Sequence, residues 1–310
     1  MLKIIPSNEV APPDPLALAG LLGPFLPQPP GVVLLSGETS AGKTVLAYNM
    51  AYAIAAGKEF VGLTPTSAHR VLYIDLESPQ LVHSTLVHAI GKSDDLGFVL
   101  EMPHLLYTAE GRKDLISSIR EWNAGVVFVD PLLVAWPCLD ENNNAEASEQ
   151  MRHLKDIARE TGTLIVPLWN MGEGYVKEKF RARGATARLD RVDVALNYTE
   201  VSDTRRKLTI VKSRYGNMKE SITVEFAGDY GFEAVEGVTA RPSDTQVIGA
   251  YILRLVSKGP KSRQELLTAV RPMGLDDNLV DKALGNLCDK GKLRRTRRGV
   301  YALPGSDDPQ

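Results

Sequence analysis

The chain has 310 residues, of which 44% are hydrophobic and 24% are charged, and its formal net charge is −2. These values are ordinary for a soluble globular protein with one large and one small domain, and they argue neither for nor against nucleic acid as a partner. No membrane partner is expected, because no apolar run approaches the roughly 20 residues of a membrane span.

The two cysteines, Cys138 and Cys288, form no metal-ligand spacing with the five histidines. We therefore expect a reducing, cytoplasmic location. No signal peptide is predicted, because prolines and Asp14 interrupt the first apolar stretch.

Residues 1–30 are predicted to form an N-terminal arm. They contain prolines at positions 6, 12, 13, 15, 24, 27, 29 and 30, which leave room for only one or two helical turns around Leu16 to Leu22. Packing on a neighbouring subunit and a free leader are equally compatible with this composition.

Residues 31–57 predict a strand, a phosphate loop and a helix. The apolar run from Val32 to Ser36 is short and β-branched, as in a buried strand. Helical apolar spacing follows, and Gly57 supplies a stop. Between them, every fixed position of G-x-x-x-x-G-K-[ST] is filled by Gly37, Glu38, Thr39, Ser40, Ala41, Gly42, Lys43 and Thr44.

The residue types in this loop suit a polyphosphate. The two glycines allow backbone N–H groups to turn inward, and the helix that follows adds its positive end. Lys43 would contact the β- and γ-phosphates, and the Thr44 hydroxyl would bind Mg²⁺. We predict an ATP and Mg²⁺ site; the alternative is a chance glycine-rich turn.

The next buried strand, residues 69–77, ends in acidic residues. Glu77 lies at its carboxyl end, where open α/β sheets bind ligands. There a carboxylate can orient and deprotonate the water that attacks the γ-phosphate. The alternative is an acid that caps the next helix, predicted from Leu81 to Ile90.

A short strand around Leu105 to Tyr107 and a helix from Lys113 to Trp122 are predicted next, followed by an apolar run that ends at Asp130. This run is a Walker B pattern, in which Asp130 binds Mg²⁺ through water or opposite Thr44; an Asp-Pro turn is the alternative. No glutamate stands beside Asp130, as one does in AAA+ ATPases. In this respect the chain resembles RecA-like ATPases, which take their glutamate from the end of the strand after the phosphate loop, and this resemblance implies that Glu77 is the catalytic carboxylate.

A helix over residues 147–161 and a strand over 163–169 lead to Asn170, which is either a γ-phosphate sensor or a strand cap. The loop from Met171 to Arg183 is basic, and we predict that it contacts a DNA backbone rather than being only solvated. Its cations are Lys177, Lys179, Arg181 and Arg183.

A short helix at 184–189 and three strands, at 192–198, 207–213 and 222–226, are expected beyond this loop. A glycine-containing turn joins the last two strands as a hairpin.

The phosphate loop, Glu77, Asp130, Asn170 and the hairpin sequence TIVKSRYGN together resemble the RecA-like ATPase core of hexameric replicative helicases, RepA-type and more distantly DnaB-type, over about residues 28–235. The resemblance implies that Lys212 and Arg214 reach a neighbouring subunit's γ-phosphate. Members of this family often have histidine where this chain has Asn170, a departure that puts the coupling of ATP to DNA in question.

The C-terminal segment resembles a winged helix. Helices are predicted from Ser243 to Ser257, from Ser262 to Val270 and from Asp276 to Lys290, and a basic hairpin follows. The hairpin cations suit contacts with duplex DNA, but acids at 276, 277 and 281 on the third helix leave protein docking open. These cations are Lys292, Arg294, Arg295, Arg297 and Arg298.

Taken together, the sequence predicts an α/β RecA-like ATPase domain over 31–240, with a mainly parallel sheet, a winged-helix domain over 241–304 and a tail over 305–310. We expect an ATP-hydrolysing DNA motor that forms a homo-oligomer, with a hexamer as the first guess: a replicative-type DNA helicase of a mobile element, plasmid or phage. The alternatives are a recombination or DNA-remodelling ATPase without unwinding, and an ATP-switched DNA-binding regulator.

Overall fold

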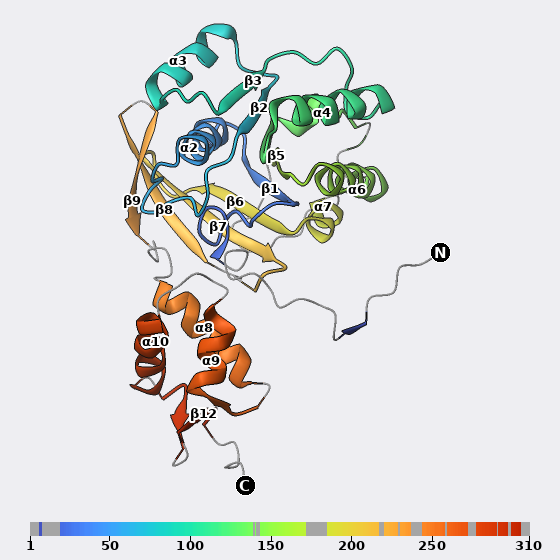
Figure 1. Cartoon of the computed structure of the whole chain (residues 1–310). Helices are drawn as coiled ribbons and strands as arrows, with labels where there is room; N and C mark the ends of the chain where they lie inside the picture. Colours follow the sequence, from blue (N-terminus) through green and yellow to red (C-terminus); the bar gives the residue numbers. More distant parts are fainter. Residues whose placement is uncertain are drawn as a thin grey trace. The chain divides into compact units, whose positions relative to one another are not determined.

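The computed structural model describes residues 6–7, 19–138, 140, 143–171, 185–216, 220–228, 230–236, 244–257, 259–271, 277–289, 291–296 and 299–304. The chain divides into two compact units (Figure 1). The larger spans Gly20–Thr239, and the smaller contains Ala240–Gln310.

One sheet forms the centre of the larger unit, and its strand order is β3-β2-β4-β5-β1-β6-β7-β8-β9. The strands from β3 to β6 in this order pair in parallel, and β7, β8 and β9 continue the sheet in antiparallel pairs. The predicted α/β class with a mainly parallel sheet is confirmed. The strands are β1 (Gly31–Glu38), β2 (Val71–Asp75), β3 (Leu96–Val99), β4 (Val126–Asp130), β5 (Leu164–Met171), β6 (Val194–Glu200), β7 (Arg205–Ser213), β8 (Ser221–Ala227) and β9 (Gly231–Glu236).

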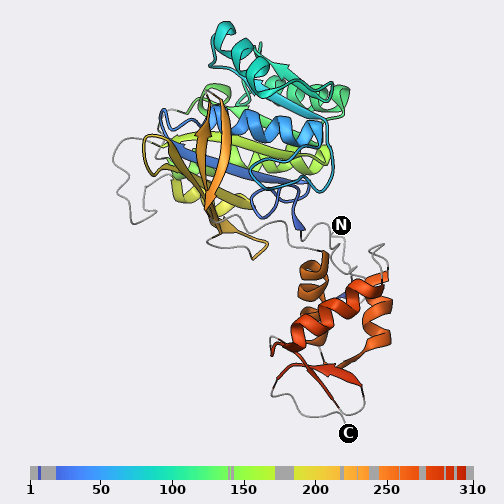
Figure 2. The ribbon, with the colours of Figure 1, turned by 90° about the vertical axis from the view of Figure 1, so that its left-hand side faces the viewer.

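Helices cover both faces of the parallel part (Figure 1; Figure 2). Successive side chains of a strand point to opposite faces, so Val33 belongs to one buried cluster and Val32 to the other. The first cluster includes residues of α2 (Lys43–Ala56) and α3 (Gln80–Ile90), and the second includes residues of α4 (Ala109–Trp122) and α6 (Asn144–Thr161). Burial on both faces explains why these strands are continuous apolar runs. The remaining helices are α5 (Leu132–Ala135) and α7 (Ala185–Arg191).

The strand predicted at Leu105 to Tyr107 is wrong. Leu106 is fully buried and its amide donates to the carbonyl of Ala135, but these residues lead directly into α4 through its N-cap, Thr108. The strand at this edge is instead β3, which pairs with β2. It has only four residues, one of them a glycine, so it carries almost no periodic signal.

Part of the segment assigned to the arm packs in the larger unit. Leu21, Leu22, Phe25 and Leu26 are buried in the same cluster as α2. The prolines around them prevent a long helix but do not prevent burial of the apolar side chains between them. Of the predicted arm, residues 1–5 and 8–18 lie outside the described part of the chain.

The smaller unit contains three helices and three short strands among its described residues. They follow the order α8 (Asp244–Val256), β10 (Lys261–Ser262), α9 (Arg263–Val270), α10 (Asp277–Asp289), β11 (Arg294–Arg295) and β12 (Val300–Ala302). The strands pair in the order β10-β12-β11, and both pairs are antiparallel. The S-x-x-E spacing of Ser262 and Glu265 predicts a capping box at the start of α9. It is present, because the Ser262 side chain accepts from the Glu265 amide and the Glu265 side chain accepts from the Ser262 amide. In the described part of the chain, no helix has the length and apolar character needed to cross a bilayer.

Candidate nucleotide site

The predicted catalytic residues Lys43, Glu77, Asp130 and Asn170 lie at one edge of the sheet. Because β1, β2, β4 and β5 are parallel, their carboxyl ends meet there. Gly37 is in register with Asn170, and Asp75 is in register with Asp130. Since β5 lies between β1 and β4, Asn170 stands between the phosphate loop and the Walker B strand.

Two glycines set the shape of the phosphate loop. A Cβ at Gly37 would lie 2.4 Å from a main-chain carbonyl oxygen of β6, so no other residue fits without a shift. Gly42 has a φ of 89°, which L-residues rarely adopt, and is the N-cap residue of α2. The loop is therefore packed closely against β6 and enters α2 through a left-handed glycine, next to the helix N-terminus, which favours phosphate.

Lys43 is buried at the base of this loop. Its ammonium donates to the carbonyl oxygens of Gly37, at 3.0 Å, and Glu38, at 2.7 Å. Burial lowers the pKa of Lys43 to about 8, against the opposing effects of Asp130 and Glu77. The side chain is thus charged at neutral pH and lies where phosphate oxygens can replace carbonyl oxygens as its acceptors.

Thr44 and Asp130 form the second part of the site. Burial raises the pKa of Asp130 to about 6, while hydrogen bonds with Tyr73 and Thr44 lower it. The Tyr73 hydroxyl donates to Asp130 Oδ2 at 2.7 Å. A hydroxyl and a carboxylate within hydrogen-bond reach of each other are hard oxygen ligands, so these residues fit Mg²⁺ shared with phosphate oxygens.

Glu77 lies two residues beyond the end of β2 and is exposed. Its charge acts on both Lys43 and Asp130, so it lies within electrostatic reach of the two. An exposed carboxylate beside the phosphate loop can accept a proton from water.

Three residues that the sequence analysis did not select adjoin the site. Asp75 is 2% exposed, and its Oδ2 accepts a 2.8 Å hydrogen bond from the Tyr48 hydroxyl. Arg206 is also buried, and its Nε donates to the carbonyl of Ala41 in the phosphate loop at 3.1 Å. Asp75 could have been found as an acid at the last position of a buried strand, and Tyr48 as a hydroxyl on the apolar face of a helix.

The phosphate loop follows the end of β1, whereas Lys212 and Arg214 lie at the opposite end of the sheet, where β1 and β6 begin. The start of β6 is level with the start of β1, since Val194 pairs with Val33. The end of β7 returns to the same edge, since Ser213 pairs with Val194. Within one subunit these two cations are therefore not brought to the nucleotide site.

The predicted DNA-binding residues are only partly described. The loop cations Lys177, Lys179, Arg181 and Arg183 lie outside the described residues, as do Arg297 and Arg298. Lys292, Arg294 and Arg295 belong to the smaller unit, where Arg294 and Arg295 form β11. Arg188 lies in α7, the helix that follows the predicted loop, and it is buried. Its guanidinium carbon is 3.7 Å from the centroid of the ring of Trp169, in the strand that precedes the loop.

A glycine-bounded phosphate loop, a buried Walker B aspartate and a strand inserted between them match a RecA-like P-loop fold. The family model described as AAA domain matches residues 12–168, slightly more than half of the chain, and the chain belongs to that family. Unlike the Asp-Glu pair typical of AAA+ ATPases, Asp130 here is followed by Pro131. No curated protein matches the chain.

Several solved structures are similar to the chain. The RadB recombinase is 18% identical, with 71% of this chain and 97% of that chain covered and a TM-score of 0.46. The flagellar accessory protein FlaH from Methanocaldococcus jannaschii is 15% identical, with 67% and 91% covered and a TM-score of 0.45. A KaiC-like protein from Pyrococcus horikoshii OT3 is 16% identical, with 70% and 94% covered and a TM-score of 0.49.

Proposed function

We propose that the protein is an ATP-driven DNA motor that works as a ring, with a hexamer as the first expectation, and that it is a replicative-type DNA helicase of a plasmid, phage or other mobile element. The observation that carries this proposal is the position of Lys212 and Arg214 at the sheet edge away from their own phosphate loop. For Lys212 or Arg214 to stabilise the transferring phosphoryl group, the residue must therefore belong to a second copy. Head-to-tail contacts of this kind form a ring when the rotation closes and a helical filament when it does not.

Each residue of the nucleotide edge has a role in this proposal. Lys43 contacts the phosphates, and Thr44 and Asp130 hold Mg²⁺, which neutralises charge on the phosphate oxygens when bound. Glu77 orients and deprotonates the attacking water, and Asn170 senses the γ-phosphate. Lys212 and Arg214 of the neighbouring copy complete the site.

The basic loop after Asn170 would grip a single DNA strand through Lys177, Lys179, Arg181 and Arg183. The loop continues directly from β5, next to the proposed sensor Asn170. This position supports coupling between ATP hydrolysis and the grip of the loop on DNA.

The smaller unit would act as a winged helix that contacts duplex DNA through Lys292, Arg294, Arg295, Arg297 and Arg298. The order of its elements supports this assignment. Two acids of α10 would repel DNA only weakly, because arginines neutralise them. Asp281 forms a bidentate pair with Arg263 at 2.7 and 2.6 Å, and Asp277 pairs with Arg271 at 3.2 Å.

A subunit-mixing experiment tests the shared site. Lys43→Ala removes phosphate chemistry from a subunit's own loop but leaves its Arg214, and Arg214→Ala does the reverse. Each variant alone should be inactive, and a mixture should recover ATP hydrolysis at interfaces that combine one good loop with one good arginine. If the mixture stays as inactive as its parts while both variants still assemble with wild type, the shared site is wrong.

Unwinding of a tailed duplex then separates the helicase from the two other functions. A DNA-remodelling ATPase would hydrolyse ATP on single strands without separating the duplex. A regulator switched by ATP would bind duplex with little hydrolysis.

A further inference from the structure

The turn that carries Glu77 is anchored by a buried carboxylate. Asp75 Oδ1 accepts a 3.0 Å hydrogen bond from the Ser78 amide. This bond spans Leu76 and Glu77, and the Leu76 amide donates to the carbonyl of Asp130 at 2.9 Å. The backbone on either side of Glu77 is therefore tied to the ends of β2 and β4.

The second oxygen of Asp75 is held from two helices. Its Oδ2 accepts a 2.8 Å hydrogen bond from the hydroxyl of Tyr48, in α2, and lies 3.4 Å from Nδ1 of His83, in α3. Tyr48 and His83 are also within hydrogen-bond distance of each other. The three side chains thus connect the helix that follows the phosphate loop to the turn that follows β2.

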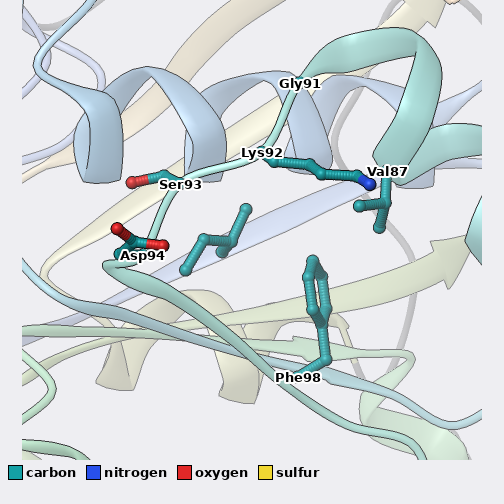
Figure 3. Close-up of a pocket in the computed structure, with 7 residues that line it drawn as sticks. Val87, Gly91, Lys92, Ser93, Asp94 and Phe98 are labelled. Atoms are coloured by element: carbon teal, nitrogen blue, oxygen red, sulfur yellow. The ribbon is translucent and has the colours of Figure 1, made fainter.

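Packed rings restrict these partners. The ring centroids of Tyr48 and Tyr73 are 4.3 Å apart, and Phe98 lies 5.5 Å from Tyr48 and 4.7 Å from His83. Phe98 also lines a pocket of about 450 Å³ with Lys92, Ser93 and Asp94. Figure 3 shows these side chains. The Tyr73 hydroxyl donates to Asp130. The packed rings of Tyr48 and Tyr73 therefore hold both Asp75, at the end of β2, and Asp130, at the end of β4.

We propose that Asp75 is a positioning residue, held by Tyr48 and His83, that fixes the Glu77 carboxylate relative to the phosphate loop. The proposal rests on the role of Glu77 in the proposed function. Glu77 is exposed and belongs to a turn rather than to a strand. Without the anchor it would occupy many positions, and hydrolysis would be slowed because the water is no longer oriented.

Asp75→Ala tests the anchor directly. The variant loses the hydrogen bond from the Ser78 amide together with the contacts to Tyr48 and His83. The resulting disorder of the turn should lower kcat for ATP hydrolysis about tenfold or more and leave KM for ATP unchanged. Asp75→Asn keeps an oxygen for the Ser78 amide and should recover most of the rate. Tyr48→Phe should give a smaller loss, and Tyr52→Phe is its control, because the Tyr52 hydroxyl accepts only an exposed hydrogen bond, from Lys58, among the described contacts.

A double-variant comparison shows whether Asp75 acts through Glu77. Glu77→Gln should lose most of the turnover, and adding Asp75→Ala should not lower the residual rate further, since the residue being positioned is already disabled. An equal loss in both backgrounds would mean that Asp75 is merely structural and would overturn the proposal. If Asp75→Ala does not fold, Tyr48→Phe in the same two backgrounds decides the question by the same criterion. Full turnover in Glu77→Gln would instead refute the role of Glu77 itself.

Discussion

The ammonium of Lys212 donates a 2.7 Å hydrogen bond to the main-chain carbonyl oxygen of Asp190, near the end of α7. Arg214 is also close to this carbonyl, at 3.4 Å, and forms a 3.6 Å ion pair with Asp193. Within one subunit, the two proposed finger residues therefore stabilise the end of the helix that follows the predicted DNA loop. In the proposed ring they would exchange these carbonyl oxygens for the phosphate of a neighbouring copy.

Replacing Arg214 with alanine should abolish hydrolysis while sparing nucleotide binding. An arginine supplied in trans contributes a factor on the order of 10³ or more to kcat in related phosphoryl transfers. Binding of ATP should be spared, because Arg214 lies far from the phosphate loop of its own subunit. Steady-state kinetics and equilibrium binding of a fluorescent ATP analogue measure the two effects. Arg120→Ala is the control, because Arg120 forms an exposed pair with Glu160 on another surface. Unchanged turnover in Arg214→Ala would refute the finger role.

The affinity for ATP should fall above about pH 8. Burial lowers the pKa of Lys43 to about 8 in the free protein, so the side chain is charged below this pH and neutral above it. If the charged form binds phosphate, the dissociation constant should rise by up to about tenfold for each pH unit above 8. Lys43→Arg stays charged throughout and should show a flat profile over the same range. A wild-type profile as flat as that of the arginine variant would contradict this account.

Asp130→Asn should stabilise the nucleotide-free protein while abolishing hydrolysis. Burial raises the pKa of Asp130 from 3.8 to about 6, so its ionised form destabilises the fold. Ionised Asp130 lowers the free energy of unfolding by at most about 3 kcal/mol. This destabilisation is fully present above pH 6 and disappears as the pH falls toward 4. Urea unfolding at pH 7.5 should therefore show a more stable variant, and the advantage should shrink toward pH 4. Asp156→Asn, at an exposed acid paired with Arg152, should show no comparable gain.

The arginines of β11 should contribute to duplex binding in a salt-dependent way. If Arg294 and Arg295 contact phosphates, replacing both with alanine should weaken binding at low salt. It should also reduce the slope of log K against log salt by about 2, since each contact contributes about 0.9. Fluorescence anisotropy with a labelled duplex measures both quantities. An unchanged slope would assign the smaller unit to another role, such as protein docking.

Local sequence patterns predicted the main features of the fold and site because each has its own chemical signature. The phosphate loop, the strand that ends at Asp130 and the capping box at Ser262 all depend on residues close in sequence. The structure differs where long-range packing decides. The four residues of β3 become a strand only by pairing with β2, and Asp75 meets Tyr48 across 27 positions. The separation of Arg214 from its own phosphate loop follows from strand direction, which no local pattern contains.

The measurement that tests the central claim most directly is steady-state ATP hydrolysis without DNA, with single-stranded DNA and with duplex, using Lys43→Ala as the blank. A motor whose loop after β5 grips one strand should hydrolyse ATP severalfold faster with single-stranded DNA than without it, and the blank should show no turnover under any condition. Wild-type turnover that ignores single strands, or responds only to duplex, would contradict the motor and favour a regulator led by the smaller unit.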